Sequence, residues 1–192
     1  MIKDLIIQNR SYRKFHENYS IDEKVLRDLI DLARLSASAR NAQPIKYLLS
    51  SDSKTNELIF PNLTWAGYLR DWTGPVEGER PSAYIIMLGD TSITTNFFCD
   101  HGIAAQSILL GATEKGLGGC IIGSIKRDEL RSIFQIPEKY EILQVIALGK
   151  PSEQIVIEPM PESGDTKYWR DKENIHHVPK RSLEELILKI LF

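Results

Sequence analysis

Apolar positions recur with a helical period in two long stretches of the chain. One helical face between residues 20 and 34 carries only apolar side chains, which are Val25, Leu26, Leu29, Ile30 and Ala33. We expect this stripe to lie in the core, and Ser20-Ile21-Asp22-Glu23 has the form of a capping box that starts the helix. Residues 93–115 form the longest helical pattern, with small residues along one side. Small side chains let another helix approach closely, so we expect a central helix that could also contact a second subunit.

Continuous apolar runs predict the strands. The run at residues 84–88 is typical of a strand buried on both faces, and residues 47–50 predict a shorter one. Residues 111–151 give a strand at 120–123, a helix that starts near Lys126, a break at Pro137 and a second strand at 142–148. This is about the length of a crossover unit that joins two strands of one sheet. Its glycines would let the backbone approach a flat ligand.

The remaining stretches are less regular. Residues 2–9 can form a short amphipathic helix, and residues 152–174 look like a polar arm or long loop. Residues 53–81 hold Trp65, Tyr68 and Trp72 among glycines and prolines. These aromatics could cover a pocket as a lid or form a satellite apolar cluster under a loop, and the sequence leaves both open. A second capping box, Ser182-Leu183-Glu184-Glu185, opens a predicted last helix over residues 183–191.

Composition narrows the class of protein. The 192 residues suit a single domain over 1–192, and the net charge of −2 gives no general attraction to nucleic acid or membrane. Cys99 and Cys120 form no CxxC pair, so we expect a reducing compartment, the cytoplasm. We also expect neither a signal peptide at the N-terminus nor a membrane span, because no apolar run is long enough for either role.

Several common catalytic motifs are absent from the sequence. Residues 116–121 lack the third glycine of the dinucleotide fingerprint and follow a helix instead of a strand. There is no GxxxxGK[ST], HExxH or GxSxG. His176 and His177 have no partner at ligand spacing, so we expect no metal site. The chemistry therefore points to a bound cofactor, with no side chain required as catalyst.

Three polar segments are candidates for binding that cofactor. Arg10, Ser11 and Arg13 could hold a phosphate through guanidinium forks and a hydroxyl, or could form a solvated basic turn. Lys180-Arg181 is a second cationic cluster with the same two interpretations. Residues 38–44 contain two amides that could read the polar edge of a heterocycle, or could simply end a helix before Pro44. Asp100 is interpreted as a structural residue near a helix start, and His101 has no assigned role.

Four blocks of this sequence together resemble the nitroreductase family of flavin mononucleotide oxidoreductases over nearly the full length. Each block is weak alone, but the four occur in the family's order. They are Arg10-Ser11-Tyr12-Arg13-Lys14-Phe15, Ser38-Ala39-Arg40-Asn41-Ala42-Gln43-Pro44, Asp100-His101-Gly102-Ile103-Ala104-Ala105-Gln106, and Gly116-Leu117-Gly118-Gly119-Cys120-Ile121-Ile122-Gly123 with Ala147-Leu148-Gly149-Lys150-Pro151.

The resemblance implies an α+β fold, with a central mixed, mainly antiparallel sheet flanked by helices. It implies an intertwined homodimer with an FMN at each interface. Arg10, Ser11 and Arg13 would hold the flavin's phosphate, ribityl chain or pyrimidine edge. Ser38, Asn41 and Gln43 would approach the same flavin from the partner chain. The backbone of Ile122 and Gly123 would face flavin N5, and Lys180 and Arg181 would complete the phosphate site.

The resemblance also implies a ping-pong reaction. NADH or NADPH would give a hydride to flavin N5, and a small acceptor such as a nitroaromatic or quinone would then be reduced at the same face. Arg13 is our candidate to stabilise negative charge at the flavin N1–O2 edge. Alternatives are reductive dehalogenation or ene reduction on the same scaffold, a flavin-binding protein without efficient turnover, and a structural dimer without flavin. Asn9, Ala37 and Ile45 depart from the family pattern, and the last two leave the substrate open.

Overall fold

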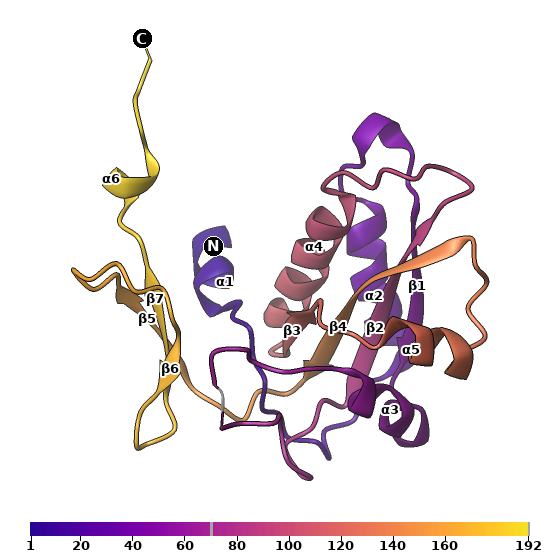
Figure 1. The fold of residues 1–192 in the computed structure, drawn as a ribbon, viewed down its shortest axis with the longest axis horizontal. Helices are drawn as coiled ribbons and strands as arrows, with labels where there is room; N and C mark the ends of the chain where they lie inside the picture. The colour runs from indigo at the N-terminus through magenta and orange to yellow at the C-terminus, as the bar shows by residue number, and fades with distance from the viewer. Residues whose placement is uncertain (70, 192) are drawn as a thin grey trace. The chain divides into compact units, whose positions relative to one another are not determined.

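A computed structural model describes residues 1–69 and 71–191 (Figure 1). The chain divides into two compact units, each described by itself below. The main unit consists of Met1–Trp65 with Thr73–Ser152, and the C-terminal unit consists of Ala66–Trp72 with Glu153–Phe192. That the whole chain acts as a single domain stays a prediction. Among the described helices, none combines the length and the apolar character that a membrane crossing requires.

A four-stranded antiparallel sheet forms the centre of the main unit. Its strands are β1 (Ile45–Ser50), β2 (Ala83–Asp90), β3 (Gly118–Ile122) and β4 (Tyr140–Gly149), in the order β1-β2-β4-β3. Every neighbouring pair is antiparallel, and Ile146 of β4 lies opposite both Ile85 and Ile121. The sheet and its helices confirm the expected α+β class with a mainly antiparallel sheet.

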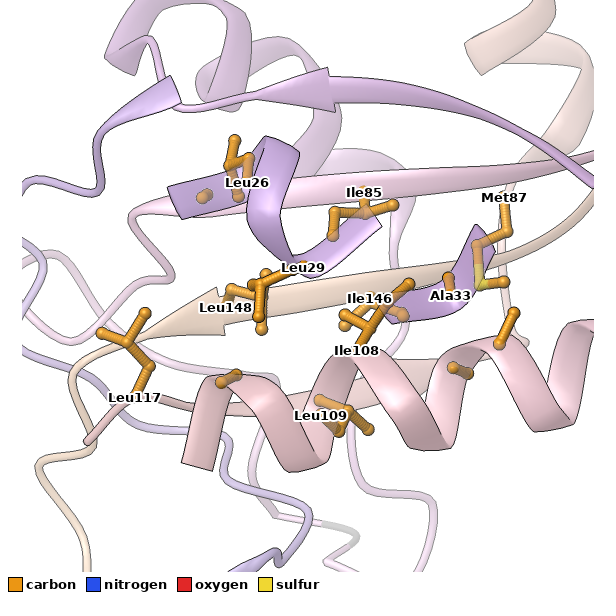
Figure 2. Close-up of a cluster of buried hydrophobic side chains, with 14 of the residues drawn as sticks. Leu26, Leu29, Ala33, Ile85, Met87, Ile108, Leu109, Leu117, Ile146 and Leu148 are labelled. Atoms are coloured by element: carbon orange, nitrogen blue, oxygen red, sulfur yellow. The ribbon is translucent and has the colours of Figure 1, made fainter. Parts of the chain in front are cut away.

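Two helices cover one face of this sheet and form the core with it. They are α2 (Glu23–Arg34) and α4 (Asp100–Glu114). β2 is buried along its whole length, as its continuous apolar run predicts. Figure 2 shows apolar side chains of both helices packed against those of β2 and β4. The helices contribute Leu26, Leu29, Ala33, Ile108 and Leu109, and the strands contribute Ile85, Met87, Ile146 and Leu148. The predicted stripe of α2 is therefore confirmed as core.

Close approach of α2 and α4 depends on a glycine. A Cβ added at Gly111 would lie 2.2 Å from Leu32 Cδ1 and 3.1 Å from Leu29 Cδ2. The small residues of α4 thus let another helix pack tightly, as expected. The predicted capping box of α2 is wrong, because the N-cap residue is Asp22 and its side chain makes no capping hydrogen bond. Helix α4 is also shorter than the 93–115 pattern, since it begins at Asp100.

The predicted strand–helix–strand segment is present, but it is not a crossover. Helix α5 (Arg127–Ile133) separates β3 from β4, and these two strands are antiparallel neighbours. An antiparallel pair needs no crossover, so α5 is an excursion within a long hairpin connection. Arg131 fastens the return to β4 by donating to the carbonyls of Ile136, Pro137 and Tyr140 at 2.9–3.0 Å.

Other elements of the main unit are short. They are α1 (Ile2–Gln8), η1 (Ala39–Asn41), α3 (Ser53–Ile59) and η2 (Phe60–Asn62). Helix α3 lies where the sequence suggests irregular chain, and its signal is the cap residue Asp52, whose carboxylate accepts the Thr55 N–H at 2.9 Å. Helix α1 is amphipathic as expected but buries none of its residues.

The C-terminal unit contains a small sheet instead of a polar arm. Strand β5 (Ile155–Pro159) runs parallel to β7 (His176–Lys180), and β6 (Trp169–Arg170) runs antiparallel to it. The expected loop over 152–174 is therefore corrected to two strands. The second capping box is confirmed at Ser182 and Glu185. Helix α6 covers only Leu183–Leu186, however, and Leu188 beyond it is 98% exposed. A short apolar helix needs a packing surface to persist.

The three predicted lid aromatics belong to different units. Trp65 is buried in the main unit, with its ring centroid 6.0 Å from that of Phe60, so it forms the satellite cluster. Tyr68 and Trp72 belong to the C-terminal unit, where Tyr68 packs on Tyr168 at 5.1 Å. A lid over a pocket stays a prediction for these two.

Candidate functional site

The N-terminal basic segment lies along the β3 edge of the sheet. Ser11 forms a parallel bridge with Gly119, and the Tyr12 N–H donates to the Gly119 carbonyl at 3.0 Å. Two blocks that the sequence separates by more than a hundred residues are thus side by side. Arg10 and Arg13 flank the bridge, so the cations and the β3 backbone share one edge of the main unit.

Two glycines of this edge allow close packing within the protein. A Cβ at Gly118 would lie 2.5 Å from Tyr12 Cδ2, and one at Gly119 would lie 2.6 Å from the Ala147 carbonyl oxygen. Protein packing therefore accounts for the lack of a side chain at Gly118 and Gly119, and their approach to a ligand stays a prediction. Gly123, just past β3, differs because an added Cβ would meet nothing within 4 Å. Its backbone borders open space beside the buried Ile122.

Arg10 and Arg13 are held close to the backbone. Arg13 is 9% exposed and donates from Nη1 to the Ser11 carbonyl at 3.1 Å. Arg10 donates from Nη2 to the Ile6 carbonyl at 2.6 Å, and burial lowers the pKa of its guanidinium. The Arg10 Nε is buried without a hydrogen-bond partner among the residues described. A buried guanidinium N–H without an acceptor suits an anionic ligand.

The loop that carries Ser38, Asn41 and Gln43 has an unusual backbone. Arg40, Asn41 and Gln43 have φ values of 55°, 53° and 51°, in the left-handed region that non-glycine residues seldom adopt. Such residues cost about 1–3 kcal/mol each and persist where their surroundings hold them. Ser38 helps to stabilise this backbone conformation, since its Oγ accepts the Gln43 N–H at 2.9 Å.

Asp100 connects this loop to α4. Its carboxylate is buried and accepts the Ser38 hydroxyl at 2.5 Å and the Ala39 N–H at 2.9 Å. The nearby Tyr47 has its pKa raised to about 12, by burial first and by the negative charge of Asp100 second. The sequence indicates only a structural residue at a helix start. The link to the loop spans more than sixty positions and has no local signal.

A cavity of about 240 Å³ lies between the loop, α2, α4 and β1. Gln43, Ile45, Tyr47 and Asp100 are among the residues that line it. Cofactor and drug-sized ligands usually occupy about 300–1,000 Å³. This cavity is therefore too small to enclose a whole flavin-sized molecule.

The loop and the β3 edge contact α4 at different positions along the helix axis. Asp100, which holds the loop, is the first residue of α4. A Cβ at Gly119, beside Ser11, would lie 2.7 Å from Leu109 Cδ2. Asp100 and Leu109 are nine positions apart, or about 14 Å along a helix axis. Within one chain the two predicted groups of binding residues are therefore separated.

Lys180 and Arg181 lie at the end of β7 in the C-terminal unit. The Lys180 carbonyl accepts the Met160 N–H at 2.9 Å, and Arg181 pairs with Glu185 at 3.3 Å. Both residues are exposed. Their predicted meeting with Arg10 and Arg13 stays a prediction.

The sequence model of the Nitroreductase family matches residues 6–150. This chain belongs to the nitroreductase family. The match begins just before the basic segment and ends after β4, so it includes both the loop and the β3 edge of the main unit.

Relatives of this nitroreductase-family chain share its fold at low identity. An NADPH-flavin oxidoreductase of Vibrio harveyi is 28% identical over 165 residues, covering 81% of this chain and 68% of its own. The solved FMN-dependent nitroreductase of Clostridium difficile R20291 is 19% identical, with a TM-score of 0.63 and coverage of 90% and 94%. A structure from Exiguobacterium sibiricum in complex with FMN is 17% identical, with a TM-score of 0.66 and coverage of 80% and 89%.

Proposed function

We propose that this protein is an FMN-dependent oxidoreductase that uses NADH or NADPH to reduce a small acceptor such as a nitroaromatic or a quinone. The observation that carries the proposal is the pairing of Ser11 with Gly119. This pairing puts the buried Arg13 and the partly buried Arg10 beside the start of β3 in a chain of the nitroreductase family. Two cysteines that form no CxxC pair, Cys99 and Cys120, support a reducing compartment such as the cytoplasm.

The residues of the β3 edge fit FMN. The flavin phosphate is an anion, and Arg10 offers a buried Nε–H that has no acceptor among the described residues. Gly123 offers backbone next to open space, which a planar ring could approach. Arg10, Ser11 and Arg13 would bind the phosphate, ribityl chain or pyrimidine edge. Lys180 and Arg181 would add charge at the phosphate.

The side chains of this site would bind and orient rather than exchange protons. Bound FMN would supply the chemistry by taking a hydride at N5 from the nicotinamide and passing it to the acceptor. Arg13 would stabilise negative charge at the N1–O2 edge, an electrostatic role that a buried guanidinium performs better than one in water. The backbone at Ile122 and Gly123 would border N5, and Asn41 and Gln43 would meet the ring's polar edges.

The binding residues support a homodimer with the flavin at its interface. The loop and the β3 edge lie about 14 Å apart along α4, so we propose that the loop of one protomer serves the flavin of its partner. Apolar side chains without cover also support a second copy. In α1, Ile2 is 62% exposed, and in the C-terminal segment Leu188 is 98% and Leu191 is 80% exposed.

The first experiment is a visible absorption spectrum of the purified protein, before and after anaerobic addition of NADH or NADPH. We expect flavin bands that bleach with one or both nicotinamides, after which acceptors can be screened. Persistent bands would point to a flavin-binding protein without efficient turnover. A colourless protein that also fails to take up added FMN would contradict the proposal.

A second experiment tests the role of Arg13. We expect Arg13→Ala to weaken FMN binding about tenfold to a hundredfold, because hydrogen bonds to charged groups contribute about 1.5–3 kcal/mol, and to lower the flavin's reduction potential. Arg27→Ala is the control, since Arg27 is an exposed partner of Glu23 on α2. Fluorescence titration gives the affinity and a dye equilibrium gives the potential. If both stay at their wild-type values, Arg13 has no such role.

A further inference from the structure

A buried carboxylate fastens the Ser38–Gln43 loop to the core of the main unit. Asp100 is 5% exposed, and both of its oxygens are engaged by the loop. Oδ2 accepts the hydroxyl of Ser38 at 2.5 Å, and Oδ1 accepts the backbone N–H of Ala39 at 2.9 Å. A residue that only stabilised its own helix would not need to direct both oxygens at another segment.

Ser38 connects Asp100 to the two amide residues of the loop, Asn41 and Gln43, through hydrogen bonds. Its Oγ accepts the N–H of Gln43 at 2.9 Å, and its carbonyl accepts the N–H of Asn41 at 2.9 Å. Asn41 and Gln43 both have left-handed backbones, which persist only where the surroundings determine them. The contact to Asp100 thus supports the conformation of the loop from Ser38 to Gln43.

Helix α4 contacts the loop at a second point and is itself packed in the core. Ser107 lies two turns after Asp100, on a similar face of the helix, and its Oγ is 2.6 Å from the Oγ of Ser36. The loop is therefore held at its start as well as at Ser38. Farther along, Gly111 packs closely against Leu32 of α2, so the apolar core fixes α4 itself.

We infer that Asp100 is a positioning residue, which acts through Ser38 to hold the amides of Asn41 and Gln43 in the orientation that meets the flavin. The inference rests on the proposed function, because the flavin is the ligand for which the loop is held. A loop that is already ordered loses little conformational entropy when the ligand binds, so the ligand binds more tightly. Asp100 itself would influence the ligand only through Ser38 and the loop.

A simpler role for Asp100 makes a different prediction. A carboxylate in the first turn of a helix is favoured by the helix dipole, whatever the loop does. Ser38→Ala separates the two roles, because it removes the side-chain contact between the loop and Asp100 and leaves the charge of Asp100 at the helix end. Asp100→Asn keeps the size of the side chain but has one carbonyl oxygen for two donors, so one donor loses its acceptor.

Trypsin digestion without flavin tests the hold on the loop directly. Arg40 is exposed within the loop, and cleavage after it, followed by mass spectrometry, reports loop order. We expect Asp100→Asn and Ser38→Ala to be cleaved there several times faster than wild type. Thr113→Val is the control, since Thr113 is buried in the same helix and donates to the Leu109 carbonyl at 2.8 Å. It should leave the cleavage rate unchanged.

FMN titration of the apoprotein tests the consequence for the ligand. We expect Asp100→Asn to bind FMN about tenfold more weakly, the effect of about one hydrogen bond lost from the support of the loop. In a background that carries Gln43→Ala, the same substitution should weaken binding less, because residues that act together are not additive. Thr113→Val should bind FMN as wild type does.

The outcomes separate this inference from the proposed function. Wild-type FMN affinity and unchanged cleavage after Arg40 in Asp100→Asn would overturn the inference and leave the flavin function intact. Wild-type protein that binds no FMN would overturn both. If circular dichroism shows that Asp100→Asn does not fold, Ser38→Ala decides, and unchanged cleavage in that variant would also overturn the inference.

Discussion

The two units of the molecule are held together by different interactions. In the main unit, β2, β4, α2 and α4 bury a continuous apolar cluster (Figure 2). In the C-terminal unit, a short three-stranded sheet depends on ion pairs and stacked rings. Apolar burial does not depend on the charge state of any group, whereas ion pairs and histidine contacts do. The main unit should therefore tolerate changes of pH and salt that weaken the C-terminal unit.

Two clusters carry the C-terminal unit. Arg170 pairs with Glu153 at 2.8 Å, with side chains 11% and 2% exposed, and its guanidinium lies 4.4 Å from the centre of the Trp72 ring. His177 lies between the carboxylates of Glu158 and Asp171. Its ring also stacks on a tryptophan ring, that of Trp169, at 4.1 Å. A buried or stacked cation contributes most when its partners remain ionised.

The largest expected effect is on the apolar core. Leu29→Ala should lower the free energy of unfolding by about 3 kcal/mol, through lost burial and the cavity left behind. Leu29 is fully buried and contacts α4 near Gly111. Urea denaturation followed by circular dichroism measures the change. Leu58→Ala is the matched control, since Leu58 is 50% exposed and should cost about 1 kcal/mol or less. Equal effects of the two would contradict the placement of the core.

A smaller effect is expected in the C-terminal unit. Glu153→Gln leaves the buried guanidinium of Arg170 without its counter-charge, which should cost about 2 kcal/mol. Hydrogen exchange of the β7 amides measures this locally, and the β2 amides of the main unit should not change. The control is Glu173→Gln, because Glu173 forms an exposed ion pair with Lys172 at 3.6 Å and its side chain is 61% exposed. Slower exchange in β7, or equal exchange in both variants, would argue against the ion pair as a support.

The same contrast explains which elements could be predicted from the sequence. Apolar periodicity predicts α2, and a continuous apolar run predicts β2, because the main unit is built by burying such patterns. In the C-terminal unit, the sequence predicts none of the three strands β5, β6 and β7. They are short and half-exposed, and β6 consists of only Trp169 and Arg170. These strands are fixed by pairing with one another through β7, and pairing leaves little trace in a local pattern.

The candidate site shows the same limit. The resemblance of short blocks selects Arg10, Arg13 and Gly123, but the role of Asp100 depends on a hydrogen bond to a distant loop. Local chemistry was also an uneven guide to helix starts. Two stretches have the form of a capping box, and only the one at Ser182 makes the hydrogen bonds. In the other, the helix begins after Asp22, so Ser20 is too early to serve as its cap.

The smallest expected effect, and the sharpest test of the contrast, is a pH dependence confined to the C-terminal unit. The hydrogen bond to Asp171 raises the pKa of His177 above its ordinary 6.5, and the one to Glu158 adds to this, against an opposing effect of desolvation. A group whose pKa is higher in the folded state stabilises that state while it is protonated. The contribution is therefore complete below about pH 6.5 and is lost as the pH rises through the raised pKa.

His177→Gln should remove this dependence, because glutamine keeps a hydrogen-bonding side chain that does not titrate. In wild type, β7 amides should be better protected at pH 6 than at pH 8.5, after correction for the intrinsic effect of pH on exchange. In His177→Gln the protection should be nearly the same at both values, and β2 should show no difference in either protein. Equal pH dependence in the variant would assign the effect to another group and would remove His177 as the reason that the two units differ.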